Sequence, residues 1–65
     1  MILRDLLKTI ELNTCIDLRY HAPKKINTVY KNLKKYLPAD IYISYGDSEV
    51  LSVAVFSDVM EVEIG

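Results

Sequence analysis

The side chains best suited to binding chemistry are basic and aromatic residues that alternate over residues 19–36. They are Arg19, Tyr20, His21, Lys24, Lys25, Tyr30, Lys31, Lys34, Lys35 and Tyr36. Cations contact phosphates and rings stack on bases, so this composition is typical of single-stranded nucleic-acid or nucleotide binding. The same lysines fit a docking face for another protein somewhat better, or a solvated surface. We predict that the binding residues are Arg19, Tyr20, Lys24, Lys25, Lys31, Lys34 and Lys35.

The other potentially reactive side chains argue against catalysis. Cys15 and His21 are the only residues of their types, and six positions along an expected strand separate them. Glu61 and Glu63 would share a strand face, where paired carboxylates can hold a hard cation but more often form the solvated face of an edge strand. The two glycines form no phosphate-binding loop. We therefore expect no enzyme, no catalytic residue, no metal site and no cofactor.

Length and composition predict one small domain. The 65 residues are 51% hydrophobic, with eight Lys and Arg against nine Asp and Glu. A chain of this size buries only about 60% of the surface that its unfolded form exposes, which leaves little room for an enclosed active site. No apolar run reaches the roughly 18 residues of a membrane span, and the charged first segment is unlike a signal peptide. We expect a single compact domain over residues 1–65, located in the cytoplasm and not in a membrane.

The charges are divided between the two halves of the chain. Residues 1–37 hold all eight basic residues and three acidic ones, whereas residues 38–65 hold six acidic residues and no Lys or Arg. This asymmetry predicts either pairing of the two halves within the molecule or separate basic and acidic surfaces for binding.

Hydrophobic periodicity then suggests the elements that position these residues. Leucine and isoleucine at positions 3, 6, 7 and 10 predict a helix over residues 2–12, and alternation over 14–20 predicts a strand. Apolar residues at 26, 29, 30, 33, 36 and 37 predict a second, basic helix over 24–37, which Pro38 ends. The less favoured alternative is a strand through Thr28–Lys31 followed by a short turn.

Three further strands are predicted in the second half, over residues 40–45, 49–56 and 59–64. Gly46 begins a turn cluster, and Ser57 with Asp58 fits a tight hairpin or a bulge in one long strand. The predicted order is α-β-α-β-β-β. We therefore expect an α+β fold with a small, mostly antiparallel sheet packed against two helices.

The strand at 50–56 is apolar on both faces apart from Ser52. Because one face would meet the helices, the other also needs cover, and a second copy of the chain is the simplest cover in so small a domain. This predicts a homo-oligomer. The alternative is that the two helices lie on opposite faces of the sheet.

Two stretches at the ends of the chain carry a family resemblance. They are Leu3-Arg4-Asp5-Leu6-Leu7-Lys8-Thr9-Ile10 with Thr14 and Ile16, and the stretch from Val50 to Ile64. They resemble small uncharacterised α+β proteins of phages and prophages of Gram-positive bacteria. The lysine-rich segment 24–37 departs from that family. The resemblance implies an accessory or counter-defence factor that acts on a host immune protein or its nucleotide signal, in the cytoplasm of the host cell.

These observations lead to one functional expectation and two alternatives. We expect a non-enzymatic, homo-oligomeric binding protein that inhibits a host immune component by protein binding. The first alternative is an oligomeric sponge that sequesters an anionic nucleotide signal. The second is a small nucleic-acid-binding regulator, whose affinity would depend on salt.

Overall fold

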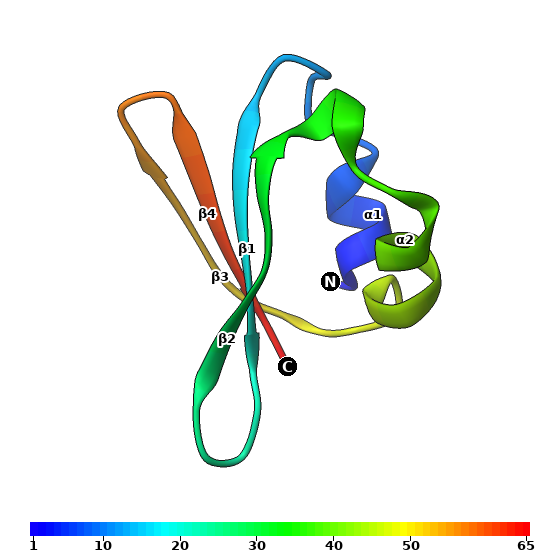
Figure 1. Cartoon of the computed structure of the whole chain (residues 1–65), viewed down its shortest axis with the longest axis vertical. Helices are drawn as coiled ribbons and strands as arrows, with labels where there is room; N and C mark the ends of the chain where they lie inside the picture. The colour runs from blue at the N-terminus through cyan, green and yellow to red at the C-terminus, as the bar shows by residue number, and fades with distance from the viewer.

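The computed structural model describes all 65 residues and contains four strands and two short α-helices (Figure 1). In chain order the elements are α1 (Leu3–Leu7), β1 (Cys15–His21), β2 (Ile26–Leu33), the 3-10 turn η1 (Lys34–Tyr36), α2 (Ala39–Tyr45), β3 (Val50–Phe56) and β4 (Val59–Ile64). The strands form one sheet in the order β2-β1-β4-β3. The α+β class is therefore confirmed. The sheet is mixed, because β1 runs parallel to β4 while the β1–β2 and β3–β4 pairs are antiparallel.

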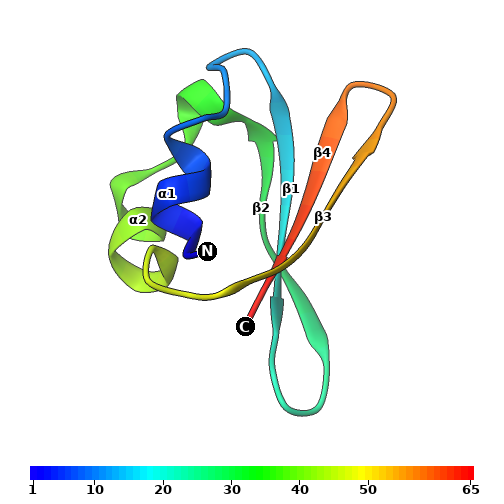
Figure 2. The ribbon, with the colours of Figure 1, turned by 180° about the vertical axis from the view of Figure 1, so that it is seen from behind.

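The core lies on one face of the two central strands. Its buried residues are Leu3, Leu7, Ile10, Ile16, Leu18, Val62 and Ile64. Those from β1 and β4 sit at alternate positions, as the period of two predicted. Figures 1 and 2 show α1 and α2 beside each other on the same side of the sheet. The alternative that placed predicted helices 2–12 and 24–37 on opposite faces does not arise, because residues 26–36 form β2 and η1. The other side of the sheet, here called the open face, has no element over it.

The predicted helix over residues 24–37 is wrong, because this segment forms β2 and η1. The less favoured alternative, a strand and a short turn, was closer. The register of β2 against β1 shifts so that Leu18 pairs with Tyr30 while Arg19 pairs with Thr28, which leaves Val29 as the extra residue of a bulge. Both Val29 and Tyr30 consequently pack against the core.

The predicted strand over residues 40–45 is also wrong, because the segment forms α2. Ile41, Tyr42 and Tyr45 pack against the core, whereas Ile43 is exposed. Counted from Ile41, the core-facing residues follow at one and four positions, which is the spacing of one face of a helix rather than the alternation of a strand. Pro38, which the sequence predicts as the end of a helix, is instead the N-cap residue of α2, which begins at Ala39.

The remaining predictions hold with adjusted bounds. The first helix is shorter than the predicted residues 2–12, since α1 ends at Leu7. Just beyond this end, the Thr9 hydroxyl donates a hydrogen bond to the Leu6 carbonyl. The strands at 14–20, 49–56 and 59–64 are confirmed as β1, β3 and β4. Ser57 and Asp58 form the tight hairpin between β3 and β4, and Ser57 takes a positive φ of 53°.

Candidate functional site

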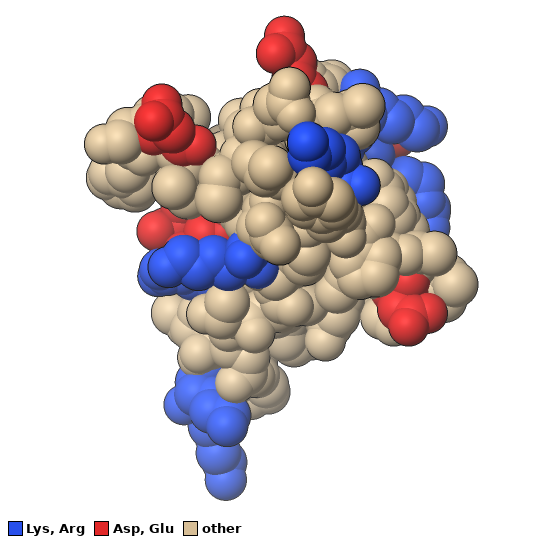
Figure 3. Space-filling model, turned by 45° about the horizontal axis from the view of Figure 1, so that its top comes forward, with Lys and Arg blue, Asp and Glu red and all other residues tan.

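The seven predicted binding residues do not form one surface, and the five lysines show this best. Lys24 and Lys25 lie in the β1–β2 hairpin, Lys31 lies on β2, and Lys34 and Lys35 lie in η1. Because β2 has eight residues, the two ends of the lysine series are about 25 Å apart. Figure 3 shows Lys and Arg side chains in separate groups with acidic side chains among them. The continuous basic face that a helix over 24–37 would have made is absent.

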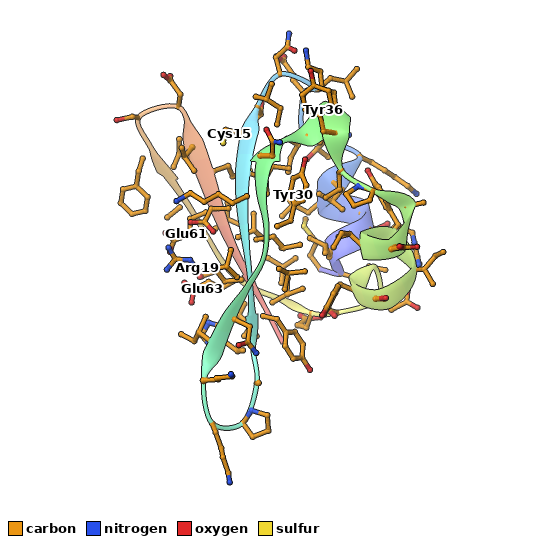
Figure 4. All side chains as sticks on the ribbon, viewed as in Figure 1. Cys15, Arg19, Tyr30, Tyr36, Glu61 and Glu63 are labelled. Carbon is orange, nitrogen blue, oxygen red and sulfur yellow. The ribbon has the colours of Figure 1, made fainter.

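The aromatic side chains also divide between different roles. Tyr20 faces the core, where its ring lies 5.5 Å from that of Tyr45. The Tyr30 hydroxyl donates a 2.6 Å hydrogen bond to the Leu33 carbonyl, and burial raises the pKa of this phenol. Of the five tyrosines only Tyr36 is exposed (Figure 4). The Lys35 ammonium lies over the Tyr36 ring. The rings therefore do not form a stacking platform beside the lysines.

Arg19 lies on the open face and is held by carboxylates (Figure 4). Its Nη2 is 3.0 Å from Asp17 Oδ2 and 3.4 Å from Glu61 Oε2. The hydrogen bond to Asp17 and the charges of Asp17 and Glu61 raise the pKa of the guanidinium. Asp17 is only 5% exposed, so this ion pair satisfies a buried charge. Arg19 is thus committed to its own sheet rather than free for an anionic ligand.

A second polar contact joins three strands at the same face. Glu63 on β4 accepts a 2.9 Å hydrogen bond from the Ser52 hydroxyl of β3 and contacts Nε2 of His21 on β1. The hydrogen bonds from His21 and Ser52 lower the pKa of the Glu63 carboxyl. Glu61 and Glu63 therefore lie on an interior strand and bind neighbouring side chains, which corrects the expectation of a solvated edge. No group of three or more His, Cys, Asp or Glu side chains is placed to hold a metal ion.

The edge strand β3 is the most unusual surface of the molecule. Four of the nine exposed large hydrophobic residues lie on this seven-residue strand: Leu51, Val53, Val55 and Phe56, each between 45% and 66% exposed. Val53 and Val55 share the face of their partners Val62 and Met60, whereas Phe56 shares the open face with Val59. The helices do not reach this strand in Figure 1, where β3 lies on the far side of β4 from them. Apolar side chains are therefore exposed on both faces.

The outer backbone of β3 is free over its second half. In a two-residue hairpin the residues that flank the turn exchange hydrogen bonds, and the ladder then alternates. Phe56 and Ala54 therefore bond to β4, whereas the N–H and C=O groups of Val53 and Val55 point outward. At the start of the strand, the Val50 N–H donates a 2.9 Å hydrogen bond to the Met1 carbonyl. The free edge thus begins after Val50.

The opposite edge of the sheet, β2, differs in its side chains. It carries Lys31, the polar residues Thr28 and Asn32, and a mid-strand bulge at Val29, whereas the register shift of β3 lies at its start, between Val50 and Ser52. Edge charges and bulges are the usual means by which proteins prevent pairing of their sheet edges with other chains. Residues 50–56 contain no charged residue. Only β3 combines a free backbone with an uncharged, apolar strand.

A shallow hollow adjoins the end of β3. It has a volume of about 510 Å³, and its lining residues are Asn13, Thr14, Val55, Ser57, Asp58, Val59 and Met60. Asp58 is its only ionisable side chain. Because Val55 forms part of its wall, the hollow extends the exposed surface of β3 towards the loop before β1. We define the docking edge as Leu51, Val53, Val55 and Phe56 together with the free backbone between them.

The sequence indicated part of this site. The apolar pattern of residues 50–56 predicts a strand that needs cover on both faces, and the structure places this strand at an edge of the sheet. The basic residues predicted to bind do not lie together. No known family model, curated protein or solved structure matches the chain. Neither helix has the length and apolar character required to cross a bilayer.

Proposed function

We propose that this protein is a non-enzymatic binding protein that docks to another protein by adding a strand to β3. The observation that carries the proposal is the docking edge, an uncharged edge strand with a free backbone and four exposed hydrophobic residues. In strand addition the backbone hydrogen bonds supply affinity, and alternate side chains supply specificity. The occupant that fits is an extended, apolar segment of a protein.

The biological setting of this proposal comes from the resemblance of both chain ends to small phage and prophage proteins. We propose that the target is a protein of bacterial immunity and that docking inhibits it in the host cytoplasm. A chain of 65 residues suits this role, because strand addition requires a sheet edge rather than a deep pocket. The docking edge and its adjoining hollow would together form the contact surface.

The nucleotide sponge and the nucleic-acid regulator have less support. Both depend on basic and aromatic side chains that act together, and the structure separates the lysines and commits Arg19 to Asp17 and Glu61. Their specific prediction is a salt-dependent affinity that falls as lysines are removed. Lys31→Ala would weaken binding in either case, whereas strand addition at β3 would be unaffected by it.

A phage infection assay tests the proposed function. The chain would be expressed in bacteria that each carry one defence system, and plaque formation by a sensitive phage would be counted. We expect the wild-type protein to restore plaques by at least about tenfold against one system, because it binds and inhibits a component. Val55→Lys places a charge on the docking edge, where desolvation opposes pairing, and should abolish the effect.

The matched control is Ile43→Lys, which lies on the exposed side of α2 and outside the docking edge. Circular dichroism would establish that both variants are folded. The target would then be purified and its affinity for each variant measured by calorimetry. Equal activity of Val55→Lys and Ile43→Lys would exclude the docking edge, and failure against every defence system would exclude the proposed target class.

A further inference from the structure

We propose that, when no target is bound, β3 pairs antiparallel with β3 of a second copy of this chain, about a two-fold axis at Ala54. The inference rests on the proposed function of β3 as the docking strand and adds its resting state. Self-pairing would cover the docking edge and join two four-stranded sheets into one.

The outward backbone groups select this register. Val53 and Val55 direct their N–H and C=O groups away from β4, and these are the groups that a second strand must meet. With Ala54 on the axis, Val53 of each copy lies opposite Val55 of the other. Each hydrogen-bonded pair exchanges two bonds, so the interface gains about four backbone hydrogen bonds.

The covered start of β3 disfavours the neighbouring register. Met1 bonds to the Val50 N–H, and Ile2 forms a bridge with Glu49, so the N-terminal segment occupies the outer side of β3 at this end. The register of β3 against β4 also shifts between Val50 and Ser52. An axis at Val53 would bring the end of the second strand onto this irregularity and against the N-terminal segment. An axis at Ala54 moves the second strand two positions further along, so that only residues Ser52 to Phe56 of the two copies lie opposite one another.

In this register, the side chains of β3 are compatible with the side chains that lie opposite them in the second copy. On the helix side, the pairs are Val53 with Val55, and cross-strand pairs of β-branched residues stabilise sheets. On the open face, two Ala54 methyl groups meet at the axis, and Phe56 lies opposite Ser52. Residues 52–56 carry no charge, so no pair of like charges is brought together. A self-complementary, uncharged strand fits a second copy without any change of sequence, which is why we choose this occupant.

Disulfide trapping tests the register in the absence of any target. All variants carry Cys15→Ser, which removes the only native thiol. Directly opposite residues at a non-hydrogen-bonded position have Cα atoms about 4.5 Å apart, within the range that a disulfide spans. We expect Ala54→Cys to form a disulfide-linked dimer at least about tenfold faster than Ser52→Cys, whose two copies would lie about 13 Å apart along the strands.

Native mass spectrometry of the wild-type protein provides an independent readout, with a dimer expected that Val55→Lys abolishes and Ile43→Lys retains. Faster trapping of Val53→Cys than of Ala54→Cys would overturn the register. A wild-type monomer at all concentrations, with no trapping at positions 52, 53 or 54, would overturn self-pairing.

The two proposals fail in different ways. Trapping and mass spectrometry use no target, so they report on self-pairing alone. If Ala54→Cys dimers form but Val55→Lys still restores plaques, self-pairing stands and docking of the target at β3 is wrong. If both proposals hold, oxidised Ala54→Cys should not bind the purified target, and reduction of the disulfide should restore binding.

Discussion

At the scale of single residues, the charges of the open face act within the sheet. Arg19 bridges Asp17 on its own strand and Glu61 on β4, and Glu63 links β4 to His21 and to Ser52 of the edge strand. The opposite charges of the two chain halves are thus partly paired inside the molecule, which was one of the two alternatives that the sequence allowed. The contact between Glu63 and Ser52 joins β3 to β4 on the open face, while the outer backbone edge of β3 stays free.

The lowered pKa of Glu63 predicts a pH dependence of stability. The carboxylate is favoured in the folded state by His21 and Ser52, with a smaller favourable charge effect from Arg19. Its contribution is therefore present above the unfolded pKa of about 4.5 and is lost as the pH falls through the lower folded pKa. We expect the wild-type protein to lose more stability than Glu63→Gln between about pH 5 and about pH 3.

Urea unfolding at each pH would measure this difference. Glu11→Gln is the matched control, because Glu11 is exposed and in no ion pair, and its curve should follow that of the wild type. Parallel curves for the wild type and Glu63→Gln would contradict the prediction.

At the scale of elements, the sequence predicts correctly the strands whose hydrophobic residues alternate without interruption. The prediction is wrong where a local feature, such as a bulge, changes the spacing of the hydrophobic residues. β1 and β4 alternate without interruption and were found. In β2 the bulge turns both Val29 and Tyr30 to the core. With Ile26 and Leu33 they imitate helical spacing, although Ile26 is exposed. A bulge depends on pairing with another strand, so no local pattern could reveal it.

The error at α2 has a different cause. Ile41, Ile43 and Tyr45 alternate, but Ile43 is 79% exposed and contributes nothing to the core. The signal that was available is the boundary pattern, because Pro38 precedes the helix, Asp40 lies in its first turn and Gly46 follows its last residue. The candidate site shows the same contrast between a correct and a wrong element. The sequence predicts β3, which is apolar on both faces, whereas the predicted basic site depends on a helix over 24–37 that does not form.

The β3–β4 hairpin supplies a prediction at this scale. Ser57 has a φ of 53°, in the left-handed region that disfavours side chains with a Cβ. We expect Ser57→Gly to raise the free energy of unfolding by up to about 1 kcal/mol, and Ser57→Val to lower it by about 1–2 kcal/mol. Urea unfolding would measure both changes. Ser48→Gly is the control, since Ser48 has no positive φ and its replacement should be destabilising; the same sign for both glycine variants would contradict the argument.

At the scale of the whole molecule, the core is one-sided and leaves β3 at its margin. The core residues come from α1, Ile10, β1 and β4, and none comes from β3. The edge strand therefore adds hydrogen bonds and partly exposed apolar surface to β4, but no fully buried side chain. A small domain that exposes such a strand is more stable when a second chain covers it.

This coupling of assembly to folding predicts a stability that depends on protein concentration. If the folded state is a β3-paired dimer and the unfolded state is a monomer, mass action favours folding as the concentration rises. For a domain of this size, a hundredfold increase should raise the thermal midpoint of the wild type by about 5–10 °C. Val55→Lys should show no shift, while Ile43→Lys should behave as the wild type, because only the first variant charges the docking edge. Thermal unfolding followed by circular dichroism at two concentrations measures the effect, and an unchanged wild-type midpoint would mean that the chain folds and unfolds as a monomer.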